Sequence, residues 1–208
     1  MLYGNKVTVA NVGDSRAVIG TQKKEEPKVQ KRKNRRPEDD NEKQKSPVVA
    51  KSLSYDQTPY RRDELDRVRA AGARVKTINQ LNNNLPEPEF WEEKEVNYDG
   101  DIPRCWKPTD VYPGTAFTRS LGDEVAEEIG VIATPEVSTR DLTPEDRILI
   151  LASDGIFEFL TSQQVVDLCM EHDDPLDACK AVLVKSYGEW LEYETRVDDM
   201  TIIVLYLD

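Results

Sequence analysis

Residues 148–158, ILILASDGIFE, join a run of apolar residues directly to a carboxylate, Asp154. The length of the run and its polar flanks predict a strand that is buried on both faces, at the centre of a core. A carboxylate at the edge of a core is costly to desolvate unless a cation, hydrogen-bond donors or a raised pKa offsets that cost. Asp154 is therefore either part of a binding site or, with Gly155, part of an ordinary turn. This stretch alone favours neither alternative.

A second acidic stretch precedes the last strand of the chain. Asp198 and Asp199 come just before residues 201–207, TIIVLYL, which are typical of a strand. If the two strands are antiparallel neighbours, the end of one and the start of the other share a rim, and Asp154 faces Asp198. Converging carboxylates repel one another, and a hard divalent cation with oxygen ligands relieves the repulsion. Mg²⁺ or Mn²⁺ fits such a site better than Zn²⁺.

Length and composition restrict the class of protein. A chain of 208 residues is long enough for a single domain with a substantial core. A net charge of −12 argues against broad nucleic-acid binding, and no run approaches the roughly 18 apolar residues of a membrane span. The three cysteines form no CxxC pair, which suits reduced thiols and argues against zinc. We expect a cytoplasmic or nuclear monomer that does not contact membranes.

The remaining periodic segments mix strands and helices. Alternating polar and apolar residues predict strands at 6–12, 17–19, 52–55 and 136–139. Helical spacing of apolar residues predicts helices at 61–71 and 124–129, and two more that begin after Thr161 and Asp174. Thr161 and Gln164 have the spacing of a capping box, and Asp123 can cap the helix at 124–129. The pattern predicts an α+β domain.

Two segments interrupt this pattern. Residues 21–51 are highly charged and nearly free of large apolar side chains in their central part, which predicts a disordered insertion. Its basic run Lys31–Arg36 could act in nuclear import or bind an anionic partner, but a solvated loop at the tip of a hairpin is favoured. Residues 76–113 contain prolines and aromatic residues without a sustained period. They predict an irregular lobe with a small core of its own.

One arginine is a candidate for anion binding. Residues 114–123, GTAFTRSLGD, are bracketed by glycines and carry Arg119. A guanidinium in such a segment could bind a phosphate group or pair with a carboxylate of the protein. The ion pair is the favoured interpretation.

Six motifs occur in order over nearly the whole chain. They are VANVGDSRAV (9–18), LSYDQTP (53–59), AAGARV (70–75), TRSLGD (118–123), LASDGIF (151–157) and DDMT (198–201). Together they resemble the metal-dependent protein phosphatase 2C (PP2C, or PPM) family of protein serine/threonine phosphatases. The resemblance implies a PP2C-like sandwich of two antiparallel β-sheets flanked by helices (α-β-β-α). It also implies a metal site at one end of the sandwich, with residues 76–113 as a flap beside it.

The resemblance also implies an activity and a set of ligands. The activity is hydrolysis of phosphoserine and phosphothreonine in protein substrates by a metal-activated water, with two or three Mg²⁺ or Mn²⁺ ions. Asp154 and Asp198 correspond to metal ligands, and Asp14 to an acid that helps to hold a third ion. Glu158 stands where the family usually has Asp, so its carboxylate is one methylene further from the backbone.

One family motif is absent from these 208 residues. The Asp-Gly-His-Gly motif, which bridges the metals and contributes a His thought to act as general acid, has no counterpart here, and neither does the phosphate-binding Arg of the family. The chain resembles the C-terminal two-thirds of the domain, so we expect a sandwich that is N-terminally incomplete. We expect this chain alone to be inactive or nearly so. The alternative function is a pseudophosphatase that acts as a binding or regulatory module.

Overall fold

Four antiparallel strands form the sheet that carries the predicted site. The computed structural model describes residues 1–23, 47–92, 95–96, 98 and 100–207. The strands of this sheet are β3 (Arg16–Gln22), β4 (Val48–Ser52), β9 (Asp146–Ala152) and β10 (Ile202–Tyr206), in the order β10-β9-β3-β4. Ala152 lies opposite Ile202, so β9 and β10 are the antiparallel neighbours that the sequence predicts.

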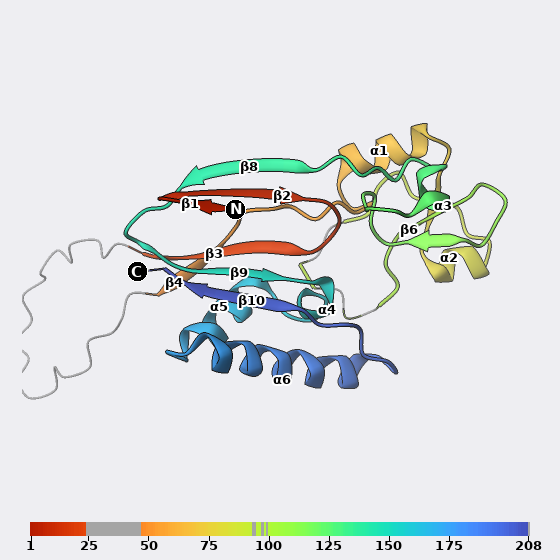
Figure 1. Ribbon diagram of the computed structural model, residues 1–208. Helices are drawn as coiled ribbons and strands as arrows, with labels where there is room; N and C mark the ends of the chain where they lie inside the picture. The colour runs from red at the N-terminus through yellow and green to blue at the C-terminus, as the bar shows by residue number, and fades with distance from the viewer. Residues whose placement is uncertain (24–46, 93–94, 97, 99, 208) are drawn as a thin grey trace, which may run out of the picture.

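A second antiparallel sheet lies over the first. It consists of β1 (Leu2–Tyr3), β2 (Lys6–Asn11) and β8 (Glu136–Asp141), in the order β1-β2-β8. Apolar residues from both sheets, among them Val7, Ile19 and Leu149, form one buried cluster. The two sheets therefore enclose a shared core, and the predicted sandwich is confirmed (Figure 1).

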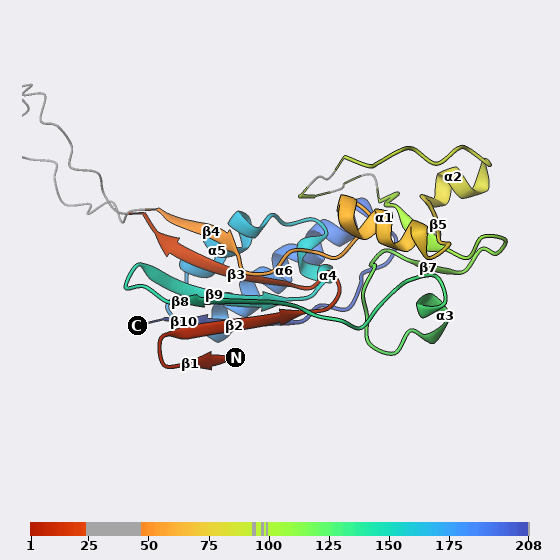
Figure 2. The same cartoon turned by 90° about the horizontal axis from the view of Figure 1, so that it is seen from above.

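Helices cover the outer face of the four-stranded sheet (Figures 1 and 2). They are α4 (Asp154–Phe157), α5 (Ser162–Met170) and α6 (Pro175–Tyr193). The predicted capping box of Thr161 is present at the start of α5, and the Asp174 carboxylate accepts two backbone N–H groups at the start of α6. These caps satisfy amides that have no partner within the helix. The fold is thus α+β, with antiparallel sheets flanked by helices.

The central apolar strand is buried on both faces over most of its length. Ile148 and Ile150 are fully buried against the helices, and Leu149 is buried between the sheets. Leu151 is different, because 39% of its surface is exposed. A cavity lined by Val9, Leu151 and other residues lies between the two sheets there. The prediction of burial on both faces therefore fails at Leu151, since the second sheet does not cover this part of β9.

A lobe with its own small core lies at one end of the sandwich (Figure 1). It contains α1 (Arg62–Ala70), β5 (Arg74–Lys76), α2 (Ile78–Asn82), β6 (Arg104–Trp106), β7 (Pro113–Thr115) and α3 (Glu124–Glu127). The strands form a sheet in the order β5-β6-β7, so the segment 76–113 begins and ends in regular structure. Each strand has three residues, which is too short to give a periodic signal. Asp123 precedes α3, but its side chain does not cap it, because its backbone is not extended (ψ 69°).

Strands β3 and β4 both extend into the segment 21–51 that is predicted as a disordered insertion. Residues 21–22 belong to β3, residues 48–51 belong to β4, and Thr21 pairs with Val49. Residues 24–46, including Lys31–Arg36, lie outside the described residues. Gln22 and Val48 are at the end of the sheet opposite to Arg16 and Ser52. Among the described helices, none is both long and apolar enough to cross a membrane.

Candidate metal centre

Carboxylates from all four strands of the sheet converge at one of its ends. Asp154 follows β9 and Asp56 follows β4, whereas Asp14 precedes β3 and Asp198 precedes β10. In the order β10-β9-β3-β4 neighbouring strands run in opposite directions, so these two ends and two starts lie on the same edge. The topology therefore gathers acids that are far apart in the sequence.

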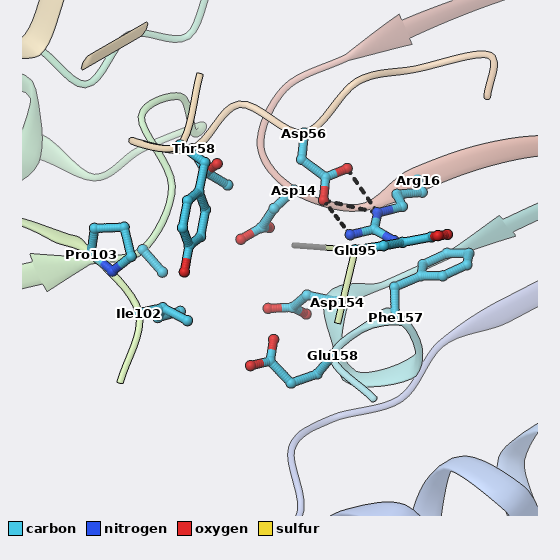
Figure 3. A pocket seen from close by; sticks show the side chains of 12 residues that line it. Asp14, Arg16, Asp56, Thr58, Glu95, Ile102, Pro103, Asp154, Phe157 and Glu158 are labelled. Atoms are coloured by element: carbon cyan, nitrogen blue, oxygen red, sulfur yellow. Dashed lines mark hydrogen bonds and ion pairs between the residues drawn. The ribbon is translucent and has the colours of Figure 1, made fainter. Parts of the chain in front are cut away.

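Three of these acids, Asp14, Asp56 and Asp154, line a common pocket together with Glu95 and Glu158. In Figure 3 the carboxylates of Asp14, Asp154 and Glu158 point toward the same space. Glu158 follows α4, and its backbone N–H donates to the Asp154 carbonyl at 2.8 Å. Ile102 and Pro103, from the lobe, form part of the opposite wall. The pocket thus has an acidic side on the sandwich and a largely apolar side on the lobe.

The rim between β9 and β10 is held by backbone contacts. The Ser153 N–H donates to the Thr201 carbonyl at 3.0 Å, and the Ser153 hydroxyl donates to the Asp199 carbonyl at 3.3 Å. A Cβ atom at Gly155 would lie only 2.3 Å from the Asp199 carbonyl oxygen. Glycine is therefore required at this position for the rim to approach so closely. This packing brings Asp198 within electrostatic reach of Asp154.

Helix α6 fixes the start of α4 from below. The Gly155 carbonyl accepts hydrogen bonds from the Ser186 hydroxyl at 2.9 Å and from the Trp190 indole N–H at 2.7 Å. Ser186 is fully buried, and the Trp190 ring contacts Phe159 edge-on. A carbonyl that accepts from two donors, one of them fully buried, is held in one position. Asp154, the preceding residue, is therefore supported by the core and is not the flexible tip of a turn.

The pKa is raised at the three carboxyl groups that point into the pocket, and also at Asp56, where burial outweighs the hydrogen bond from Arg16. Burial, followed by the charge of Asp154, raises the pKa of Asp14 to about 7. Burial and then the charge of Asp198 raise the pKa of Asp154, and burial and then the charge of Asp154 raise that of Glu158. The neighbouring protein groups do not offset the unfavourable free energy of ionising these carboxyl groups. A divalent cation among them would offset it, and Mg²⁺ and Mn²⁺ prefer oxygen ligands.

Sequence reasoning missed the ion pair beside these acids. Among the described residues that line the pocket, the one basic side chain is Arg16. Its Nε lies 2.8 and 3.0 Å from the two carboxylate oxygens of Asp56, and its guanidinium stacks 5.0 Å from the centre of the Phe157 ring. The charge of Arg16 is therefore paired with Asp56 and not with Asp14, Asp154 or Glu158. The position of Asp56 directly after a predicted strand was the signal that could have revealed it.

Arg119 lies in a different cluster, in the lobe. It is not among the described residues that line the pocket. Its Nη2 lies 2.6 Å from Glu64 and 3.3 Å from Glu136, and its Nη1 donates to the Thr134 carbonyl at 2.9 Å. The favoured interpretation, an ion pair within the protein, describes these contacts. Phosphate binding by Arg119 stays a prediction.

An acidic group where α1 of the lobe meets the start of β8, called the lobe cluster here, resembles a metal site by distance alone. Carboxylate oxygens of Asp63, Glu64 and Glu136 lie within 4.8 Å of one another. Arginine side chains occupy these oxygens: Arg61 pairs with Asp63 and Glu136, while Arg67 and Arg119 pair with Glu64. Burial opposes ionisation of Glu64, but hydrogen bonds from Arg119, Arg67 and Thr118 outweigh it and lower its pKa to about 2. This cluster is already neutralised.

The family follows from comparison with known proteins. The sequence matches the family model described as protein phosphatase 2C over residues 1–187. The chain belongs to the protein phosphatase 2C family. Probable protein phosphatase 2C 35 of Arabidopsis thaliana is 46% identical over 209 residues, covering 100% of this chain and 53% of that protein. Probable protein phosphatase 2C 61 of the same plant is 32% identical, covering 99% and 52%. The chain thus spans about half the length of these curated PP2C relatives.

Solved structures agree with the PP2C fold. A serine-threonine phosphatase 2C from Toxoplasma gondii matches with a TM-score of 0.68 at 18% identity, covering 98% of this chain and 55% of that one. A C. elegans sex determining protein matches with a TM-score of 0.58 at 15% identity, covering 97% and 37%. At such identities the likeness shows the fold alone. It confirms the predicted sandwich.

The predicted PP2C ligands are brought together to different degrees. Asp14, Asp154 and Glu158 share the pocket. Asp198 is exposed at the rim, where its carboxylate accepts the Asp199 N–H at 2.8 Å. Its charge raises the pKa of Asp154, which is consistent with the predicted shared rim. The roles of these residues as ligands stay predictions.

Proposed function

We propose that the protein containing this chain is a metal-dependent phosphatase that hydrolyses phosphoserine and phosphothreonine in protein substrates. The observation that carries the proposal is the convergence of acids from four strand ends on one edge of the sheet, where three of them, Asp14, Asp56 and Asp154, line one pocket. Family membership supports a phosphatase, and the donor set supports Mg²⁺ or Mn²⁺. Bound there, two or three such ions would supply a water nucleophile of lowered pKa and neutralise the phosphoryl oxygens.

The residues of this chain have distinct parts in such a site. Asp154 and Asp198 would hold metal from the two sides of the β9–β10 rim, and Asp14 and Glu158 would hold it from β3 and α4. Arg16 keeps Asp56 neutralised, which limits the total charge that the ions must balance. Tyr60, Ile102 and Pro103 line the pocket as well and would shield one face of a bound phosphoryl group from water.

Residues 1–208 alone have little or no activity under this proposal. The Asp-Gly-His-Gly motif of the family would contribute further metal ligation and a general acid, and these residues do not contain it. Metal binding by the carboxylates described above does not depend on the acid step. The chain alone should therefore bind Mn²⁺ weakly while releasing phosphate slowly or not at all.

The test is Mn²⁺-dependent release of phosphate from a phosphothreonine peptide by the complete protein. Asp154→Ala should lower the rate by more than about 100-fold, because even residues that only orient metal ligands change metal affinity or activity by about 10–100-fold. Asp173→Ala, at an exposed acid between α5 and α6, is the matched control and should leave the rate unchanged.

Unchanged activity in Asp154→Ala would refute the proposed role of the pocket. A complete protein that neither binds Mn²⁺ nor releases phosphate would instead favour the pseudophosphatase. Calorimetric titration with Mn²⁺ separates these outcomes, because a binding module has no need of the ion.

A further inference from the structure

Gln57 is a fully buried polar residue beside the pocket, and the roles assigned above do not use it. Its exposed fraction is 0%. Its side-chain Oε1 accepts the Gly13 N–H at 2.7 Å, and its Nε2 donates to the Asn11 carbonyl at 3.2 Å. The Gln57 backbone N–H also donates to the Gly13 carbonyl at 3.1 Å. Three hydrogen bonds from one residue therefore hold the turn that ends in Asp14.

The orientation of this amide follows from its partners. The Gly13 N–H can only be accepted by an oxygen, and the Asn11 carbonyl can only be met by a nitrogen. Glu136 lies near this amide, and its pKa is lowered first by Arg61 and also by Gln57. No polar atom of the side chain is left without a partner, which is the condition under which a buried amide fixes its surroundings.

The turn before Asp14 is sharp, and the Asn11 side-chain Nδ2 donates to the Gly13 carbonyl within it at 3.1 Å. Gly13 has a φ of 103°, a conformation that L side chains rarely adopt, so the chain reverses sharply just before Asp14. Asp14 then lies in a pocket where burial and neighbouring carboxylates disfavour its ionised form. Without a cation, repulsion between the two carboxylates favours conformations in which Asp14 turns away from Asp154. A rigid attachment on the other side of Gly13 opposes that displacement.

Gln57 also connects this turn to the lobe. Its carbonyl accepts the Thr118 N–H at 2.7 Å, and the Thr118 hydroxyl donates to Glu64 at 2.6 Å. The position of Asp14 is thereby tied to the buried cluster around Glu64.

We propose that Gln57 is a positioning residue for metal binding, acting through Gly13 to hold the Asp14 carboxylate toward Asp154. The inference rests on the proposed metal site and extends it to a residue that touches neither metal nor substrate. Removing the amide leaves the Gly13 N–H and the Asn11 carbonyl without partners and frees the turn. The expected result is weaker Mn²⁺ binding, since losing a group that orients a ligand weakens affinity by about 10–100-fold.

The experiment is calorimetric titration of Mn²⁺ into the complete protein. Gln57→Met keeps the length of the side chain but removes both hydrogen bonds, and it should weaken binding by about 10-fold. Gln57→Asn is the milder change, because it retains an amide on a shorter side chain, and it should also weaken binding. Val166→Ala is the matched control, because Val166 is equally buried but lies on α5 beside Gly20, away from the rim. It should lower the melting temperature without changing the affinity.

A double-mutant cycle separates positioning from general loosening. In an Asp14→Ala background Gln57→Met should cause no further loss of affinity, because the two changes act on the same ligand. An equal loss in both backgrounds, or wild-type affinity in both Gln57 variants, would overturn the inference while leaving the metal site intact. Failure of the wild-type protein to bind Mn²⁺, or full binding by Asp154→Ala, would overturn the proposed function and this inference with it.

Discussion

The molecule contains two dense groups of carboxylates with opposite surroundings. In the lobe, Glu64 and its acidic neighbours meet arginine side chains at hydrogen-bond distance, and the pKa of Glu64 falls to about 2. At the end of the sandwich, Asp14 and Asp154 meet one another, and the pKa of Asp14 rises to about 7. The lobe cluster satisfies the simple distance criterion for a metal site. The charge left unpaired, and not the density of acids, therefore distinguishes the proposed metal site from the lobe cluster.

The largest effect should come from breaking the lobe cluster. Arg119→Met leaves the Glu64 side chain, which is 2% exposed, with Arg67 as its remaining guanidinium partner among the described contacts. Breaking a buried ion pair on one side costs about 3–5 kcal/mol. We expect the free energy of unfolding, measured by urea denaturation, to fall by about 3 kcal/mol. Arg62→Ala, which breaks an exposed pair with Asp66, is the control and should cause no measurable change.

If folded Arg119→Met protein lost Mn²⁺ binding without losing stability, the structural role of the lobe cluster would be contradicted. It would mean that the lobe cluster serves a ligand and not the fold.

The opposite result is expected in the pocket. Asp14→Asn removes a carboxylate whose pKa is raised by burial and by Asp154. Without divalent metal at pH 7.5, we expect the free energy of unfolding to rise by about 1–2 kcal/mol, because an unfavourable buried charge is lost. With saturating Mn²⁺ the order should reverse, since the wild type gains ligand-binding energy that the variant cannot. A destabilised Asp14→Asn protein without metal would show that the acid is already compensated.

The smallest effect is a difference in pH dependence. Asp14 has a raised pKa, about 7 against an ordinary 3.8, so the folded state retains its proton where the unfolded state has lost it. Its contribution to stability therefore falls as pH rises from about 4 to 7. Glu64 has a lowered pKa, about 2 against 4.5, so its contribution is present above pH 4.5 and is lost as pH falls toward 2.

Each slope should be below about 1.4 kcal/mol per pH unit. Urea unfolding across this range in chelator is the measurement. Asp14→Asn should flatten only the upper slope and Glu64→Gln only the lower one, and a variant that flattens both would show that the two clusters are coupled.

The sandwich could be predicted because its signals are local. The apolar run before Asp154 and the apolar run after Asp198 identify β9 and β10, and their pairing follows from a shared rim. The capping box at Thr161 identifies α5 in the same way. The short strands β5, β6 and β7 could not be predicted, because three residues carry no period and their pairing joins distant segments.

Only part of the site could be predicted, because its other residues are brought together by the order of the strands. Asp154 and Asp198 could be paired from two strands, but adding Asp56 and Arg16 requires the full strand order. Gln57 is harder still, because nothing in the sequence shows that an amide after Asp56 is buried against Gly13. Which acids remain unpaired depends on where the arginines lie, and that is decided by tertiary packing.

The most direct measurement is an anomalous-difference map from crystals of the complete protein grown with Mn²⁺. We expect peaks among the carboxylates of Asp154, Asp198 and Asp14, and none between Glu64 and Glu136, where arginines already balance the charge. A peak at the lobe cluster with none at the end of the sandwich would contradict the account.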